Sequence, residues 1–210
     1  MLPAYLTVKQ ASEVTLEINK SLFLTAVTPV ETEAAAMDFV LDRKKRHKEA
    51  NHNCSAYVIG LHGQYQKADD DGEPGGTAGK PILEVLNKAG VKNAAIVVTR
   101  YFGGIKLGAG GLIRAYTKAA ADGLAAAGII ENHLHSRLSI ELSYHLLGTV
   151  ENQLRLNNYP IETKEFSEVV RLVALARTGR EASLLQLIAD ITANQAQVRP
   201  LGELYLPITT

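Results

Sequence analysis

The chain has 210 residues, of which 46% are hydrophobic and 21% are charged, a composition typical of an ordinary soluble globular protein. Its 22 basic and 22 acidic side chains give a formal net charge of zero, which excludes attraction of the whole molecule to nucleic acid or an acidic membrane surface. The single cysteine, Cys54, excludes an intramolecular disulfide, and no apolar run has the form of an export signal or a membrane span. We therefore expect a cytoplasmic protein with no membrane partner.

The first two-thirds of the chain predict a mixture of strands and helices. Alternating apolar residues favour strands at 12–18 and 21–27, joined by a two-residue turn at Asn19-Lys20. Helical spacing then predicts a helix within 31–50, with acids at its start and bases at its end. Further elements follow in the order strand 54–61, return segment 64–67, loop 68–81, helix 82–90, doubly buried strand 93–100 and helix 112–128.

The last third has a pattern of its own. Apolar spacing predicts the order strand, helix, strand, strand, helix, strand, at 136–144, 145–158, 159–167, 168–177, 179–195 and 196–206. This βαββαβ order is that of the split βαβ plait, which forms a complete small domain. We therefore expect an α+β protein with two domains, 1–134 and 135–210.

The stretch 100–116, RYFGGIKLGAGGLIRAY, holds five glycines between Gly103 and Gly111. Each ordered glycine costs roughly 0.5–1 kcal/mol relative to alanine, so these residues need a local reason. A glycine loop between a buried strand and a helix N-terminus directs backbone N–H groups at one point, where an anion can bind. The alternative is a tight strand-to-helix turn that only packs against the sheet.

The loop 68–81, ADDDGEPGGTAGKP, brings four carboxylates together at Asp69, Asp70, Asp71 and Glu73. Carboxylates this close repel one another unless they are solvated, cap backbone groups or share a cation. A divalent cation between them and a phosphate on the glycine loop is one interpretation. The other is that Asp and Gly only shape consecutive turns, and we assign no metal ion and no cofactor.

Three further features have a structural and a functional interpretation. His52 and Cys54 share a strand face, but without a second cluster of ligands they favour a solvated histidine and a buried, inert thiol. The basic run at 43–48, RKKRHK, suits either a phosphate backbone or a solvated helix end that interacts with Asp38 and Asp42. Tyr101 and Phe102 could stack on bases, although neighbours on a strand face opposite ways, so at most one is available.

Three strings resemble the IMPACT/YigZ family: HNCSAY at 52–57, DDGEPGGTAGKP at 70–81 and VVTRYFGGIKLGAGGLIRAY at 97–116. The resemblance covers about the first 130 residues, and the tail is similar to the C-terminal domain of bacterial members. It implies an N-terminal left-handed β-α-β domain, like a small-subunit ribosomal protein domain and elongation factor G domain IV. It also implies a ferredoxin-like C-terminal domain.

These relationships imply a non-enzymatic regulatory protein associated with translation, which binds RNA, the ribosome or a translation-factor protein. The alternative is an enzyme or binding protein for a phosphorylated small molecule with a divalent cation. The expected anion-binding residues are Arg100, Gly103, Gly104, Lys106, Gly108, Gly110, Gly111 and Arg114. The expected motif loop is Asp70, Asp71, Gly72, Glu73, Pro74, Gly76, Thr77 and Gly79, with support from His52, Tyr101 and Tyr116.

Overall fold

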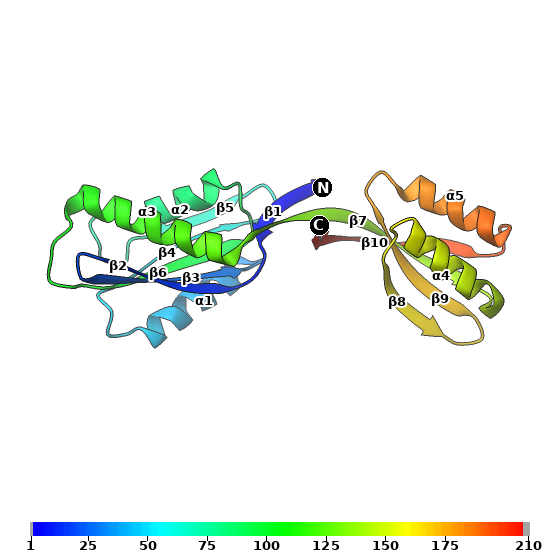
Figure 1. Cartoon of the computed structure of the whole chain (residues 1–210), viewed down its shortest axis with the longest axis horizontal. Helices are drawn as coiled ribbons and strands as arrows, with labels where there is room; N and C mark the ends of the chain where they lie inside the picture. Colours follow the sequence, from blue (N-terminus) through cyan, green and yellow to red (C-terminus); the bar gives the residue numbers. More distant parts are fainter. Residues whose placement is uncertain (1, 208–210) are drawn as a thin grey trace. The chain divides into compact units, whose positions relative to one another are not determined.

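A computed structural model describes residues 2–207 and has the expected α+β composition. Within this range there are two five-stranded sheets and five α-helices, and the chain divides into two compact units (Figure 1). One unit is Tyr5–Glu131; the other begins at Asn132 and includes the residues before Tyr5. None of the helices in this range combines the length and apolar composition that membrane crossing requires.

The first unit is built on a sheet with the strand order β2-β3-β6-β4-β5, in which every neighbouring pair is antiparallel. Its elements are β2 (Ser12–Ile18), β3 (Ser21–Pro29), α1 (Glu33–Arg46), β4 (His52–Ile59), β5 (Tyr65–Asp69), α2 (Gly79–Lys88), β6 (Ala94–Tyr101) and α3 (Gly108–Ala127). The short strand β1 (Ala4–Val8) precedes them and belongs to the other sheet. The predicted turn between β2 and β3 is confirmed, because Asn19 and Lys20 both have positive φ, at 47° and 63°.

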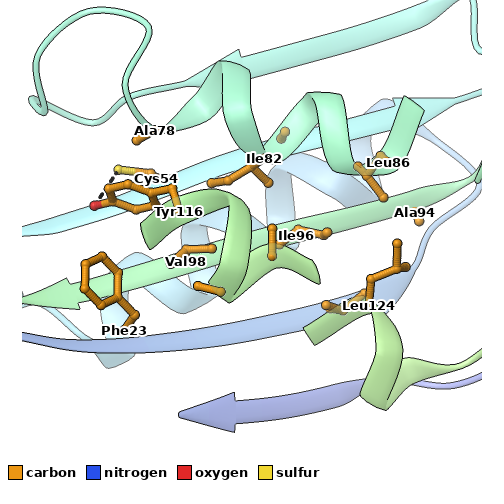
Figure 2. Packing of buried hydrophobic residues seen from close by; sticks show 14 of the residues in the cluster. Phe23, Cys54, Ala78, Ile82, Leu86, Ala94, Ile96, Val98, Tyr116 and Leu124 are labelled. Atoms are coloured by element: carbon orange, nitrogen blue, oxygen red, sulfur yellow. Dashed lines mark hydrogen bonds between the residues drawn. The ribbon is translucent and has the colours of Figure 1, made fainter. Parts of the chain in front are cut away.

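The two faces of this sheet are covered by different helices. Cys54, Ala56 and Val58 of β4 face the core formed with α2 and α3, whereas Tyr57 and Ile59 face α1. Figure 2 shows the first of these two cores, with Cys54 beside Tyr116. The alternation follows from the two-residue side-chain period of a strand. Residues Ala94–Arg100 of β6 are all buried, which confirms the prediction of a doubly covered strand.

The start of α3 differs from the prediction. The helix begins at Gly108, four residues before the predicted Leu112, so Gly108, Gly110 and Gly111 lie in its first turn. Apolar spacing could not reveal this turn, because glycine has no side chain to contribute to the pattern.

The second unit follows the predicted element order. It comprises β7 (Ile129–Leu142), the 3₁₀ turn η1 (Tyr144–Leu146), α4 (Leu147–Leu156), β8 (Ile161–Phe166), β9 (Val170–Arg177), α5 (Glu181–Thr192) and β10 (Gln197–Pro207). β7 pairs with both β9 and β10, and β9 also pairs with β8, all antiparallel. β7 begins seven residues before the predicted Ser136, because its polar first half pairs with β10 even though it lacks apolar alternation.

Candidate functional site

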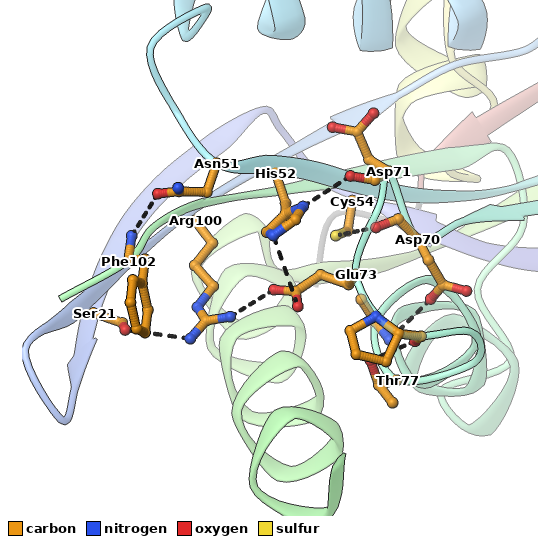
Figure 3. A network of polar contacts seen from close by, with 12 residues as sticks. Ser21, Asn51, His52, Cys54, Asp70, Asp71, Glu73, Thr77, Arg100 and Phe102 are labelled. Atoms are coloured by element: carbon orange, nitrogen blue, oxygen red, sulfur yellow. Dashed lines mark hydrogen bonds and ion pairs between the residues drawn. The ribbon is translucent and has the colours of Figure 1, made fainter. Parts of the chain in front are cut away.

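A buried ion pair joins the two motif loops. Arg100, at the end of β6, donates from Nη1 to Glu73 Oε1 over 2.7 Å, and the two side chains are only 6% and 3% exposed (Figure 3). Arg100 also donates from Nη2 to Ser21 Oγ at 3.4 Å, and its guanidinium lies 5.5 Å from the Phe23 ring centroid. The charge of Arg100 is therefore balanced inside the protein.

Beneath this pair lies a chain of buried polar groups. The Tyr116 hydroxyl donates to Glu73 Oε1 at 2.8 Å, and the Cys54 thiol lies 3.3 Å from that hydroxyl and 3.0 Å from the Asp70 carbonyl oxygen. Burial, more than any charge, raises the pKa of Cys54 far above its usual range. Cys54 is therefore a protonated structural thiol, in agreement with the interpretation from sequence.

The acidic loop is organised by its own carboxylates. Asp70 accepts hydrogen bonds from the backbone N–H groups of Gly76, Ala78 and Gly79, at 2.7, 3.0 and 2.8 Å. Burial acts to raise the pKa of Asp70, but these three donors outweigh it and hold the pKa below its ordinary value. Asp70 thus fixes the loop and the start of α2.

Asp69 and Asp71 are also occupied. Lys44 of α1 lies 2.7 Å from Asp71 Oδ1 and 3.4 Å from Asp69 Oδ2, and the Asn53 N–H donates to Asp71 Oδ2 at 2.6 Å. No group of three or more potential metal ligands is present among residues 2–207. The carboxylates of this loop satisfy backbone and cationic groups of the protein itself.

The glycines of the second motif have two different structural reasons. A Cβ on Gly103 would lie 2.0 Å from the backbone of Lys20, so only glycine fits there. Gly104 and Gly108 have φ of 85° and 69°, in the left-handed region. The Gly103 N–H donates to Ser21 Oγ at 3.2 Å, which ties the stretch to β3.

The N-terminus of α3 is left open. No side chain caps it and its first turn contains no acidic residue, so its first N–H groups have no intrahelical acceptor. Lys106 is exposed just before the helix, and Arg114 is exposed one turn into it. A Cβ on Gly110 would lie 3.7 Å from Arg114 Nη1, so that guanidinium lies over the first turn. The helix dipole and these two cations favour an anion here.

A cleft of about 360 Å³ lies between the two motifs. Its walls include His52, Glu73, Pro74, Phe102, Lys106 and Gly108. The sequence placed most of these residues in the site but gave no reason to include Asn51, which lines the cleft and accepts from the Phe102 N–H at 2.8 Å. No sequence signal marks Asn51, because its role depends on the pairing of β4 with β6.

Several expected site residues have structural positions instead. Thr77 donates to the Pro74 carbonyl oxygen at 2.7 Å, and a Cβ on Gly79 would lie 2.6 Å from the Asp69 backbone. Gly72 and Gly76 have φ of 85° and 76°. Tyr101 is directed to α1, where its hydroxyl lies 2.9 Å from His47 Nδ1.

The basic run at 43–48 is largely engaged within the protein. Arg43 is buried and donates to Glu13 at 2.8 Å, and its Nη2 lies 2.9 Å from His47 Nε2. Arg46 pairs with Asp42 at 2.8 Å. This arrangement favours the structural interpretation of the run over a phosphate-binding one.

Comparison with known proteins identifies the class. Residues 19–124 match the model of the Impact N-terminal domain, and residues 140–195 match that of a domain of unknown function, DUF1949. The chain belongs to the IMPACT family.

Relatives extend along nearly the whole chain. It is 44% identical to IMPACT family member YvyE of Bacillus subtilis (strain 168), over 97% of this chain and 94% of the relative. It is 32% identical to IMPACT family member YigZ of Escherichia coli (strain K12), over 89% and 93%. A crystal structure described as that of an hypothetical protein superposes with a TM-score of 0.63 at 31% identity, over 94% of this chain and 97% of the other.

Proposed function

We propose that this protein is a non-enzymatic regulator associated with translation, which acts in the cytoplasm and binds RNA, alone or within the ribosome, through the cleft between its two motifs. The observation that carries the proposal is the uncapped N-terminus of α3, which opens on the cleft beside Lys106 and has the Arg114 guanidinium over its first turn, outside the cleft lining. Backbone N–H groups and two exposed cations suit the phosphate of a nucleic acid. A translation-factor protein is the other partner that this surface would serve.

The topology of the first unit supports the fold that accompanies this proposal, a left-handed β-α-β domain. β3 and β4 are parallel with β6 between them and are connected by α1; β5 and β6 are parallel with β4 between them and are connected by α2. Because α1 and α2 cover opposite faces of the sheet, the two crossovers have opposite hands. One crossover is therefore left-handed, which is rare among crossover connections.

The second unit supports the ferredoxin-like assignment. In its sheet β10 pairs with β7, β7 with β9 and β9 with β8, and β1 is a further neighbour of β7. α4 and α5 pack on the sheet through one cluster that includes Val150, Leu154, Leu184 and Ile188. This is the arrangement of a split βαβ plait. We place the boundary between the two domains near residue 134.

The test is binding of ribosomes and of RNA by the purified protein at low salt. We expect co-sedimentation with ribosomes and a mobility shift with single-stranded RNA. Arg114→Glu should weaken RNA binding about tenfold or more, because it reverses a charge beside the phosphate position. Lys88→Glu is the matched control, since Lys88 is exposed in the last turn of α2 and does not line the cleft. Absence of RNA and ribosome binding, or equal losses in both variants, would contradict the proposal.

The size of the cleft favours one alternative, a phosphorylated small molecule as the ligand. About 360 Å³ lies within the range of small-molecule sites, roughly 300–1,000 Å³. The divalent cation of this alternative would have to displace the contacts that Asp69, Asp70 and Asp71 already make. Calorimetry with nucleotides, with and without magnesium, separates the cases: magnesium-dependent heat supports the alternative, and its absence with intact RNA binding supports the regulator.

A further inference from the structure

The wall of the cleft contains a carboxylate oxygen, on a side chain that is almost wholly buried, to which the protein donates no hydrogen bond. Glu73 Oε1 accepts from Arg100 and from Tyr116, whereas Oε2 accepts no hydrogen bond from any residue in the described range. The Glu73 side chain is only 3% exposed and lines the cleft. A carboxylate oxygen in this position is available to accept a hydrogen bond from an N–H or O–H group of a ligand.

The imidazole of His52 presents a second acceptor to the same space. His52 Nδ1 lies 2.9 Å from the carbonyl oxygen of Asp71, and because a carbonyl only accepts, Nδ1 carries the proton. In the neutral ring Nε2 therefore offers a lone pair, and it lies 3.9 Å from Glu73 Oε2. Figure 3 shows these two groups directed at each other. The gap is too long for a direct hydrogen bond, so in the neutral form of the ring two acceptors face each other across it.

Two neighbouring acceptors are satisfied together by two donors on adjacent atoms. The cis-diol of a ribose provides such a pair, with one hydroxyl for each acceptor. The rest of the cleft fits the rest of a ribonucleotide: the N-terminus of α3 and Lys106 suit its phosphate. Phe102, 43% exposed and with Arg100 5.4 Å from its ring centroid, provides a flat surface for its base.

We propose that Glu73 and His52 recognise the free 2′,3′-diol of a ribonucleotide, so that the cleft binds the 3′-terminal nucleotide of an RNA or a free ribonucleoside monophosphate. This inference rests on the proposed RNA-binding function and deepens it, because it makes the site specific for a chain end. An internal nucleotide has its 3′ oxygen in a phosphodiester and lacks the diol.

The experiment compares ligands that differ only at the diol, using the full chain and fluorescence anisotropy. The RNA series is one short single-stranded oligonucleotide with a 3′-terminal ribose, a 3′-deoxyribose, a 3′-phosphate or a periodate-oxidised end. The nucleotide series is adenosine 5′-monophosphate and its 2′-deoxy and 3′-deoxy forms, added as competitors. We expect each loss of a hydroxyl to weaken binding about tenfold or more, because it leaves one acceptor of the cleft unpaired inside the complex.

A variant pair tests the residues. His52→Ala should bring one of two affinity ratios, native to 2′-deoxy or native to 3′-deoxy, to near one, because Glu73 still accepts from the other hydroxyl. A general loss of stability does not produce this readout. His62→Ala is the matched control, because His62 is an exposed histidine of the same unit outside the cleft and should preserve both ratios. If His52→Ala does not fold, the ligand series on the unaltered protein still decides.

The outcomes distinguish an RNA end from a free nucleotide as the ligand, and they distinguish failure of the diol inference from failure of the proposed function. A preference for the diol in the RNA series alone identifies an RNA terminus, and one in the nucleotide series alone identifies a free nucleotide. RNA binding that ignores all changes at the 3′ end, with no preference for the diol in the nucleotide series, overturns the diol inference and leaves the proposed function standing. Absence of binding to both series overturns the inference, and absence of co-sedimentation with ribosomes as well overturns the proposed function.

Discussion

The ion pair between Glu73 and Arg100 illustrates at the residue scale how burial changes the value of a charge. Removing one partner leaves the other charged and buried, so we expect Arg100→Met to lower the free energy of unfolding by about 3–5 kcal/mol. Changing both residues to Met should restore most of this loss, because no uncompensated charge remains. Urea unfolding of the two single variants and the double variant measures the effect.

An exposed ion pair provides the control for this comparison of single and double variants. Lys118 and Asp122 form an ion pair on α3 with side chains 61% and 38% exposed, and Lys118→Met should cost less than about 1 kcal/mol. A double variant of Glu73 and Arg100 that is no more stable than either single variant would contradict the argument. It would show that packing around the pair, not the lone charge, dominates.

A single residue, His47, makes the stability of the fold depend on pH. Burial, followed by the charge of Arg43, lowers the pKa of His47 below its ordinary value of 6.5. The unfolded chain therefore binds the proton more readily, so stability is complete above pH 6.5 and declines as the pH falls through the lowered pKa. His47→Gln should remove this part of the decline.

Thermal or urea unfolding between pH 7 and pH 5 tests the prediction. Glu13 also has a lowered pKa, chiefly because Arg43 donates to it, but its contribution is lost only below its ordinary value of 4.5. The two effects therefore fall in separate pH ranges. An unchanged pH profile in His47→Gln would show that His47 is not the titrating group.

At the scale of the element, the glycine stretch between β6 and α3 divides into residues with different reasons for being glycine. Gly103→Ala should destabilise the fold by about 1–3 kcal/mol, because the added carbon would overlap the Lys20 backbone. Gly110→Ala should instead stabilise it by about 0.5–1 kcal/mol, because the site is open and the backbone is helical. Urea unfolding measures both.

The two glycine variants, Gly103→Ala and Gly110→Ala, also relate the stability of the protein to its binding of RNA. If Gly110 is kept so that a phosphate can approach the first turn of α3, Gly110→Ala should weaken RNA binding while it stabilises the protein. Stabilisation without any change in RNA affinity would place the phosphate elsewhere on the turn. A neutral Gly103→Ala would show that the β2–β3 hairpin shifts without strain.

Elements with a strong periodic pattern could be predicted from the sequence, and those defined by backbone alone could not. The hairpin at Asn19-Lys20 and the doubly buried β6 were confirmed, because turn chemistry and apolar runs are local signals. The start of α3 was missed, because its first turn consists mainly of Gly108, Gly110 and Gly111. The first half of β7 was missed because its partner strand, β10, lies about 70 residues further along the chain.

At the scale of the whole molecule, the site depends on strand order, which no local pattern encodes. The sequence identified both motif loops but could not place them side by side. The pairing of β3 with β6 brings Ser21 within reach of Arg100 and Gly103, and the pairing of β4 with β6 brings His52 opposite Arg100. The contact between Arg100 and Glu73 joins this three-strand arrangement to a loop distant in sequence, so it could not be predicted from spacing.

The small number of exposed cations beside the N-terminus of α3 predicts a weak salt dependence for RNA binding. Single-stranded nucleic acid gives a slope of log affinity against log salt of about −0.7 for each phosphate neutralised. With Lys106 and Arg114 as the contacting cations we expect a slope of about −1.4, measured by anisotropy between 50 and 200 mM salt. A slope steeper than about −4 would require about six phosphate contacts and would bring the run at 43–48 into the binding surface. Lys45→Glu and Lys48→Glu test whether the run at 43–48 contacts RNA, because both side chains are exposed. Both variants should weaken RNA binding if the slope is steep, and leave it unchanged if the slope is about −1.4.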